Sequence, residues 1–111
     1  MSGRDERVAR NEAASREINE SIEEAHEEHP RGPDAHIRIL CECGRDSCDR
    51  LIAITMPEYE KVRADPTRFV VVRDHVMADV EVVVDETDRF VVVAKREGEP
   101  AEVAREEDPR S

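Results

Sequence analysis

The stretch HIRILCECGRDSCDRLIAIT, at positions 36–55, decides the fold of this 111-residue chain. Apolar side chains alternate along residues 36–42, the pattern of a strand with one buried face. Residues 50–54 favour a second strand, and residues 43–48 between them are rich in turn formers. The stretch therefore predicts a hairpin that carries all three cysteines of the chain, with Cys41 on the first strand and Cys43 and Cys48 in the turn region.

Helical patterns lie on both sides of this hairpin. Residues 5–28 place apolar residues at spacings of three and four, which predicts a helix with a narrow apolar stripe that either lies on the sheet or pairs with another chain. Thr55 and Glu58 have the spacing of a capping box, which predicts a short helix over residues 56–64. The residues of the apolar stripe are Val8, Ala14, Ile18, Ile22 and Ala25.

The remaining segments are rich in valine. Strands are predicted at residues 68–73, 80–85 and 89–95, each with a run of three valines that we interpret as core buried on both faces. A short helix is predicted at residues 99–107. Together the segments predict an α+β fold, with a single small antiparallel sheet of about five strands, an N-terminal helix and a short helix after the second strand.

Charge divides the chain into three parts. The net charge is -11, from 17 basic and 28 acidic residues. We expect an acidic N-terminal helix and linker at residues 1–34, a core domain at 35–95 and an acidic tail at 96–111, with residues 29–34 as the linker because they hold two prolines and a glycine. The acidity argues against a nucleic-acid surface, and with neither a membrane-length apolar run nor a secretory leader we expect a cytoplasmic protein.

The cysteines follow the spacing C-x-C-x4-C at Cys41, Cys43 and Cys48. In a reducing compartment such a cluster favours metal binding or redox chemistry over a disulfide framework. A tetrahedral zinc site needs a fourth ligand, and His75 is preferred because it follows a strand, where a loop is expected. Buried structural thiols and a thiol–disulfide switch remain open as alternatives, as does a surface role for His75.

No other group of polar residues in the sequence indicates a catalytic or binding function. The acidic residues around His26 and His29 near the end of the first helix are interpreted as a solvated helix end. The chain has neither a phosphate-binding glycine loop nor a nucleophile elbow, and its carboxylates show no pairing suited to acid–base catalysis. We therefore expect a protein that is not an enzyme.

Several motifs in order resemble a group of small actinobacterial proteins of unknown function. They comprise the run at residues 10–13, the cysteine motif, residues 59–71, His75 and residues 89–92. In that group the histidine usually follows Pro-Gly, whereas Arg73 and Asp74 precede it here. The resemblance implies a Cys3His metal site and supplies no activity, substrate or partner.

These observations lead to one hypothesis and one alternative. The hypothesis is a non-enzymatic cytoplasmic domain with a structural zinc bound by Cys41, Cys43, Cys48 and His75, which interacts with another, unidentified protein through its helix or an acidic face. The alternative is a thiol-based redox or metal sensor that releases a partner on oxidation. The sequence predicts neither a nucleic-acid nor a membrane partner.

Overall fold

The structure is a computed structural model that describes residues 3–29, 31, 32 and 34–110. Pro30 and Pro33 of the expected linker lie outside the described residues. The elements, in chain order, are α1 (Gly3–Glu28), β1 (His36–Leu40), β2 (Leu51–Thr55), α2 (Met56–Arg63), β3 (Arg68–Val71), the 3-10 turn η1 (Arg73–His75), β4 (Glu81–Glu86), β5 (Val91–Lys95) and α3 (Glu99–Glu106).

The strands confirm the α+β class but form two sheets rather than one. β1 and β2 pair as the predicted antiparallel hairpin, and β3, β5 and β4 form a second antiparallel sheet in that order. The sheets meet at Glu42, whose backbone N–H donates to Val70 O at 2.9 Å. The Glu42 carboxylate in turn accepts from Val70 N at 3.2 Å. A side chain thus takes the place of a backbone partner, so the ladder does not continue from one sheet to the other.

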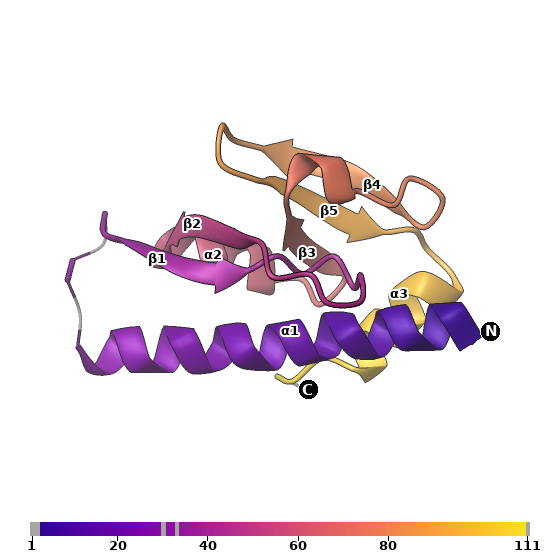
Figure 1. Ribbon diagram of the computed structural model, residues 1–111, viewed down its shortest axis with the longest axis horizontal. Coiled ribbons are helices and arrows are strands. Elements are labelled where there is room, and N and C mark those ends of the chain that lie inside the picture. Colours follow the sequence, from indigo (N-terminus) through magenta and orange to yellow (C-terminus); the bar gives the residue numbers. More distant parts are fainter. Residues whose placement is uncertain (1–2, 30, 33, 111) are drawn as a thin grey trace.

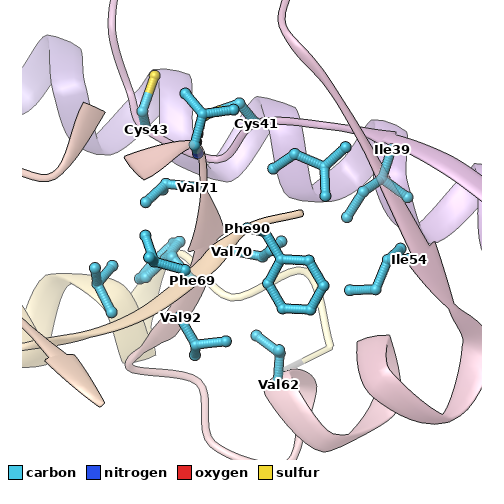
Figure 2. Close-up of a cluster of buried hydrophobic side chains, with 14 of the residues drawn as sticks. Ile39, Cys41, Cys43, Ile54, Val62, Phe69, Val70, Val71, Phe90 and Val92 are labelled. Carbon is cyan, nitrogen blue, oxygen red and sulfur yellow. Dashed lines mark hydrogen bonds between the residues drawn. The ribbon is translucent and has the colours of Figure 1, made fainter. Parts of the chain in front are cut away.

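The helix after the second strand begins as its sequence predicts. The Thr55 hydroxyl accepts from Glu58 N at 3.2 Å, and the Glu58 carboxylate accepts from Thr55 N at 2.9 Å, which completes the capping box. Tyr59 and Val62 of α2 are buried in the core. Figure 2 shows this core, in which Val62 and Phe90 lie between Ile54 of β2 and Val92 of β5, while Cys41 and Cys43 lie at its edge beside Val71.

The long helix α1 packs on the rest of the fold through polar residues. It runs along nearly the whole length of the molecule, below β1 and beside α3 (Figure 1). The expected apolar stripe is not its buried face, because Ile18 is 48% exposed and Ala14 and Ala25 are also exposed. The buried residues have the same helical spacing but are Glu12, Arg16, Asn19, Glu23 and His26.

Partners on the strands explain how this polar face can be buried. Asn19 donates to Leu40 O and accepts from Leu40 N, which ties α1 to β1. Lys95 lies 2.5 Å from a Glu12 oxygen and 2.9 Å from a Glu81 oxygen. Buried charges persist when they are paired in this way. We call the paired buried residues the polar layer: Glu12, Arg16, Asn19, Glu42, Glu81 and Lys95.

The valine runs differ in burial. Those of β3 and β5 are buried, as predicted, but Val82, Val83 and Val84 of β4 are 39%, 48% and 41% exposed. The interpretation of β4 as a strand buried on both faces is therefore wrong. β4 is the edge strand beyond β5, and its register shifts between Val83 and Asp85. An edge position leaves one side of the strand and much of its faces uncovered.

The described helices include none with both the length and the apolar character that crossing a membrane requires.

Candidate metal centre

The structure brings the three cysteines and His75 together. One ligand atom from each of the four residues lies within 4.8 Å of the others. His75 Nδ1 is 3.6 Å from Cys48 Sγ and 3.8 Å from Cys41 Sγ. Ligands at about 2.3 Å (sulfur) and 2.1 Å (nitrogen) from a tetrahedral zinc are separated by about 3.6 Å. The two histidine–cysteine separations in this group, which we call the Cys3His cluster, therefore match those of a zinc site.

The hairpin turn positions the cysteines. Cys41 follows β1, and its N–H still donates to Arg50 O, so the strand pairing continues to the cluster. Gly44 then turns the chain with φ +76°, and Cys48 N donates to Arg45 O at 3.3 Å. The positive φ is a conformation that glycine adopts without steric cost. This turn returns Cys48 towards the first two cysteines.

His75 comes from the other sheet. It ends η1, directly after β3, and its N–H donates to Val72 O at 2.9 Å. Arg45 of the hairpin turn donates to Asp74 O at 3.1 Å, so the two loops also contact each other directly. The Arg73-Asp74 sequence before the histidine thus accommodates the turn that the site needs.

Backbone donors and neighbouring thiols set the charge of the cluster. Val72 N donates to Cys41 Sγ at 3.3 Å, and Arg45 N donates to Cys43 Sγ at 3.5 Å. The hydrogen bond from Cys41, with help from Arg45 N, lowers the pKa of Cys43 to about 5. The hydrogen bond to Cys43 and burial raise the pKa of Cys41, and burial raises that of Cys48. Without a cation the protein environment thus favours one thiolate, and three thiolates need a positive charge among them.

The helix α1 supports the turn in a way that sequence patterns did not indicate. Asn11 donates to Gly44 O at 3.0 Å and to Asp46 Oδ1 at 2.8 Å. A Cβ on Gly44 would lie 2.7 Å from Val8 Cγ1 and 2.9 Å from Val8 O. The glycine is therefore needed for close approach of α1 as well as for its φ. The only sequence signal for this contact is the glycine inside the cysteine motif.

A second group of possible metal ligands contacts an arginine side chain. Oxygens of Glu23, Glu27 and Glu60 lie within 4.8 Å of one another. Arg110 lies 3.0 Å from both Glu23 and Glu60, so a side-chain cation already compensates these charges. Glu23 and His26 are buried, which corrects the interpretation of this region as a fully solvated helix end.

Comparisons with known proteins found no significant match to this chain. No protein-family model matches it, and no curated protein or solved structure matches it significantly. The resemblance to small actinobacterial proteins stays a prediction from the sequence.

Proposed function

We propose that the protein is a non-enzymatic interaction domain built around a structural zinc bound by Cys41, Cys43, Cys48 and His75. The observation that carries this proposal is the convergence of four soft ligand atoms within 4.8 Å. Thiolate and imidazole are the ligands that zinc prefers in closed, four-coordinate sites. Such a site keeps no open position for a reacting water, which favours a structural role over catalysis.

The metal would join the two sheets. Three ligands come from the β1–β2 hairpin and the fourth from η1 after β3. Between these regions the Glu42 backbone and side chain make one hydrogen bond each to Val70. Bonds from all four ligands to one metal ion would therefore strengthen the association of the two sheets. The expected core domain at residues 35–95 has 61 residues, and domains of that size are commonly stabilised by a metal.

The test is a measurement of zinc content and of thiol reactivity in protein purified under reducing conditions. We expect one zinc per chain and three thiols that react only after chelation or denaturation. His75→Ala should lower zinc affinity by at least tenfold, whereas His29→Ala, at an exposed histidine, should leave affinity unchanged. Metal-free protein whose thiols react at once, or that keeps them slowly reactive and buried, contradicts the proposal.

A redox or metal sensor is the second candidate. It is favoured by the half-buried Cys48 and by the pKa of about 5 at Cys43, since a thiolate is the species that peroxide attacks. Oxidation would join two of the thiols in a disulfide and reduce the peroxide to water, with release of the metal. A sensor loses zinc at micromolar peroxide within minutes, whereas a structural site retains it; zinc release followed with a chromophoric chelator distinguishes the two.

We further propose that partner binding uses the β4 edge. The described surface exposes three consecutive valines there, followed by Asp85 and Glu86. An edge strand can pair with an added extended segment, and alternate side chains of that segment then contact the exposed valines. Since the neighbouring residues and the whole chain are acidic, the segment that fits is apolar with basic flanks.

Paired substitutions at two equally exposed apolar residues test this surface. Val83 of β4 and Ile18 of α1 are both 48% exposed. Proteins captured by the zinc-loaded chain would be mapped to short synthetic peptides, and their affinities measured with the Val83→Glu and Ile18→Glu variants. We expect at least tenfold loss with Val83→Glu only, for a peptide with Lys or Arg flanks. Loss with Ile18→Glu only would assign the interaction to α1 and overturn the β4 proposal.

A further inference from the structure

An open groove of about 710 Å³ lies between the end of α1 and the start of β1. These two segments lie side by side at the end of the molecule remote from α3 (Figure 1). The side chains of the groove that can carry positive charge are those of His26, His29, Arg31, His36 and Arg38. No described residue that lines the groove is acidic, although the chain has 28 acidic residues. The groove is therefore a locally basic surface on an acidic protein.

Two arginines of the groove supply cations without protein partners. The guanidinium groups of Arg31 and Arg38 have neither a hydrogen bond nor an ion pair with any described residue. By contrast, Arg63 lies 2.7 Å from a Glu20 oxygen and Arg89 lies 2.7 Å from a Glu58 oxygen. Both groove arginines are exposed, so their charges are available to a ligand.

The open edge of β1 adds a backbone donor. Leu40 N donates to Asn19 Oδ1 at 2.8 Å, so the N–H of Leu40 faces α1. Backbone groups alternate between the two edges of an antiparallel strand, so Arg38, two residues earlier, also directs its N–H towards α1. In the described part of the chain no group accepts from this N–H. The groove thus continues the contact between Asn19 and Leu40 along an edge that is not yet paired.

His26 gives the groove a side chain whose position is set by packing. It is 9% exposed, and its ring has no hydrogen-bond partner among the described residues. Its ring nitrogens are not fully sealed from solvent, unlike the buried unpaired atoms of Arg16 and Arg63. A neutral imidazole carries one N–H donor, and a protonated imidazole carries two. An oxygen of a ligand in the groove can accept from this ring.

The charges that oppose an anion are weaker at the groove than the two guanidinium charges. Glu27, Glu28 and Asp34 are the nearest acidic residues along the chain, but they are exposed and do not line the groove. The carboxyl end of α1 adds about half a negative charge. The net charge of the chain is screened beyond about 8 Å at physiological salt. Contacts inside the groove therefore determine which ligand binds.

We propose that this groove binds the phosphate group of a small phosphate monoester, with Arg31 and Arg38 as its cationic contacts. Guanidinium groups bind phosphate oxygens with paired hydrogen bonds, and two such groups match the charge of a dianion. Ile22 and Ala53 line the groove and are partly exposed, which gives the organic part of the ester an apolar surface. The site shares no residue with the Cys3His cluster or the β4 edge.

Matched anions test the ligand class on the protein as purified. Phenyl phosphate, inorganic phosphate and benzoate would be titrated at about pH 8, where a phosphate monoester carries two negative charges, while the amide resonances of Ile22 and Arg38 are followed by NMR. We expect saturable shifts with phenyl phosphate and about tenfold weaker binding of the other two, which lack the apolar group or the second charge. Equal or tighter binding of inorganic phosphate or of benzoate overturns the monoester, and no saturable shift with any probe overturns the site.

Charge-removing substitutions locate the binding. Arg31→Gln and Arg38→Gln should each weaken phenyl phosphate binding about tenfold, and they should leave thermal stability unchanged because neither side chain has a partner to lose. Arg10→Gln, at an exposed position in the first half of α1, is the control, since it changes the net charge equally and should leave binding unchanged. If a glutamine variant fails to fold, Ala25→Glu places a carboxylate at the groove from an exposed helical position and should weaken binding in the same way. Unchanged binding in a folded groove variant, or an equal loss with Arg10→Gln, overturns the proposal.

Discussion

The Cys3His cluster and the polar layer are both groups of polar side chains in a small core, but only the polar layer contains charges of both signs. In the polar layer, Lys95 lies between Glu12 and Glu81, and Arg16 and Asn19 both contact Glu42. Opposite charges therefore compensate one another. In the Cys3His cluster the four residues are all potential donors of electron pairs to a cation. Ligands gathered in this way could hold an external ion, whereas paired charges need none.

Metal removal tests this contrast with the largest expected effect. Structural zinc sites contribute about 10–16 kcal/mol in small peptides, which matches or exceeds the stability of about 5–15 kcal/mol of a whole domain. We therefore expect a strong chelator to abolish the cooperative thermal transition, and zinc to restore it. Circular dichroism melting with and without chelator is the measurement. A chelated protein that melts within a few degrees of the untreated one contradicts the structural role.

The second-largest effect is expected when the Lys95 cation is removed from the polar layer. Lys95→Met leaves Glu12 and Glu81 buried without their partner, so we expect about 3–5 kcal/mol of destabilisation in urea unfolding with zinc present. Adding Glu12→Gln and Glu81→Gln to the same chain should recover most of it, because no unpaired charge then remains. A triple variant as unstable as Lys95→Met would show that the cost is lost packing, not lost charge compensation.

The contact between α1 and the cysteine turn is tested at Gly44. Gly44→Ala must accept φ +76° and a Cβ that meets Val8 at 2.7 and 2.9 Å, so we expect about 2–3 kcal/mol of destabilisation. Gly32→Ala is the control, since its φ is +107° but nothing in the described part of the chain lies within 4 Å of the added Cβ. It should cost about 1 kcal/mol, measured by urea unfolding. Equal losses of unfolding free energy in the two variants would mean that α1 does not pack closely against the turn.

The sequence predicted the elements whose signals are local. Alternation predicted β1, runs of valine predicted β3, β4 and β5, and the Thr55–Glu58 capping box predicted α2. The cysteine spacing with a loop histidine predicted the four residues that the structure brings together. Each of these signals lies within one short segment, and His75 was chosen for its expected loop rather than for a contact with the cysteines. The existence of two sheets was not predictable in this way, because it depends on the side chain of Glu42 reaching a strand that lies far along the chain.

The buried face of α1 was not predicted because apolarity was used as the mark of burial. Glu12, Arg16 and Asn19 follow helical spacing as regularly as the exposed Ile18 and its apolar neighbours. Their burial depends on partners such as Glu42 and Lys95, which come from later strands. The sequence signal for a buried polar face on α1 was a charged residue at a buried position of a strand, such as Lys95. It becomes informative only when the strand and the helix are considered as a pair.

The half-buried ion pair between Arg89 and Glu58 is expected to give the smallest effect, and it completes the contrast with the polar layer. The two side chains are 29% and 30% exposed and lie 2.7 Å apart. The hydrogen bonds from Arg89 lower the pKa of Glu58 from 4.5 to about 2. The folded protein therefore binds this proton less readily than the unfolded chain, and the contribution is full above about pH 4.5 and is lost as pH falls towards 2.

Solvent screening keeps that contribution below about 1 kcal/mol. We expect Glu58→Gln to unfold in urea at a lower midpoint than the wild type at pH 7, and the difference should shrink in 1 M NaCl, which screens the charges while zinc stays bound. The exposed Glu24→Gln is the control and should follow the wild type at both salt concentrations. A difference that is unchanged in 1 M NaCl would belong to the capping hydrogen bond to Thr55 rather than to the charge. Partial exposure thus makes this pair weak and dependent on pH, whereas burial makes the loss of Lys95 far more costly.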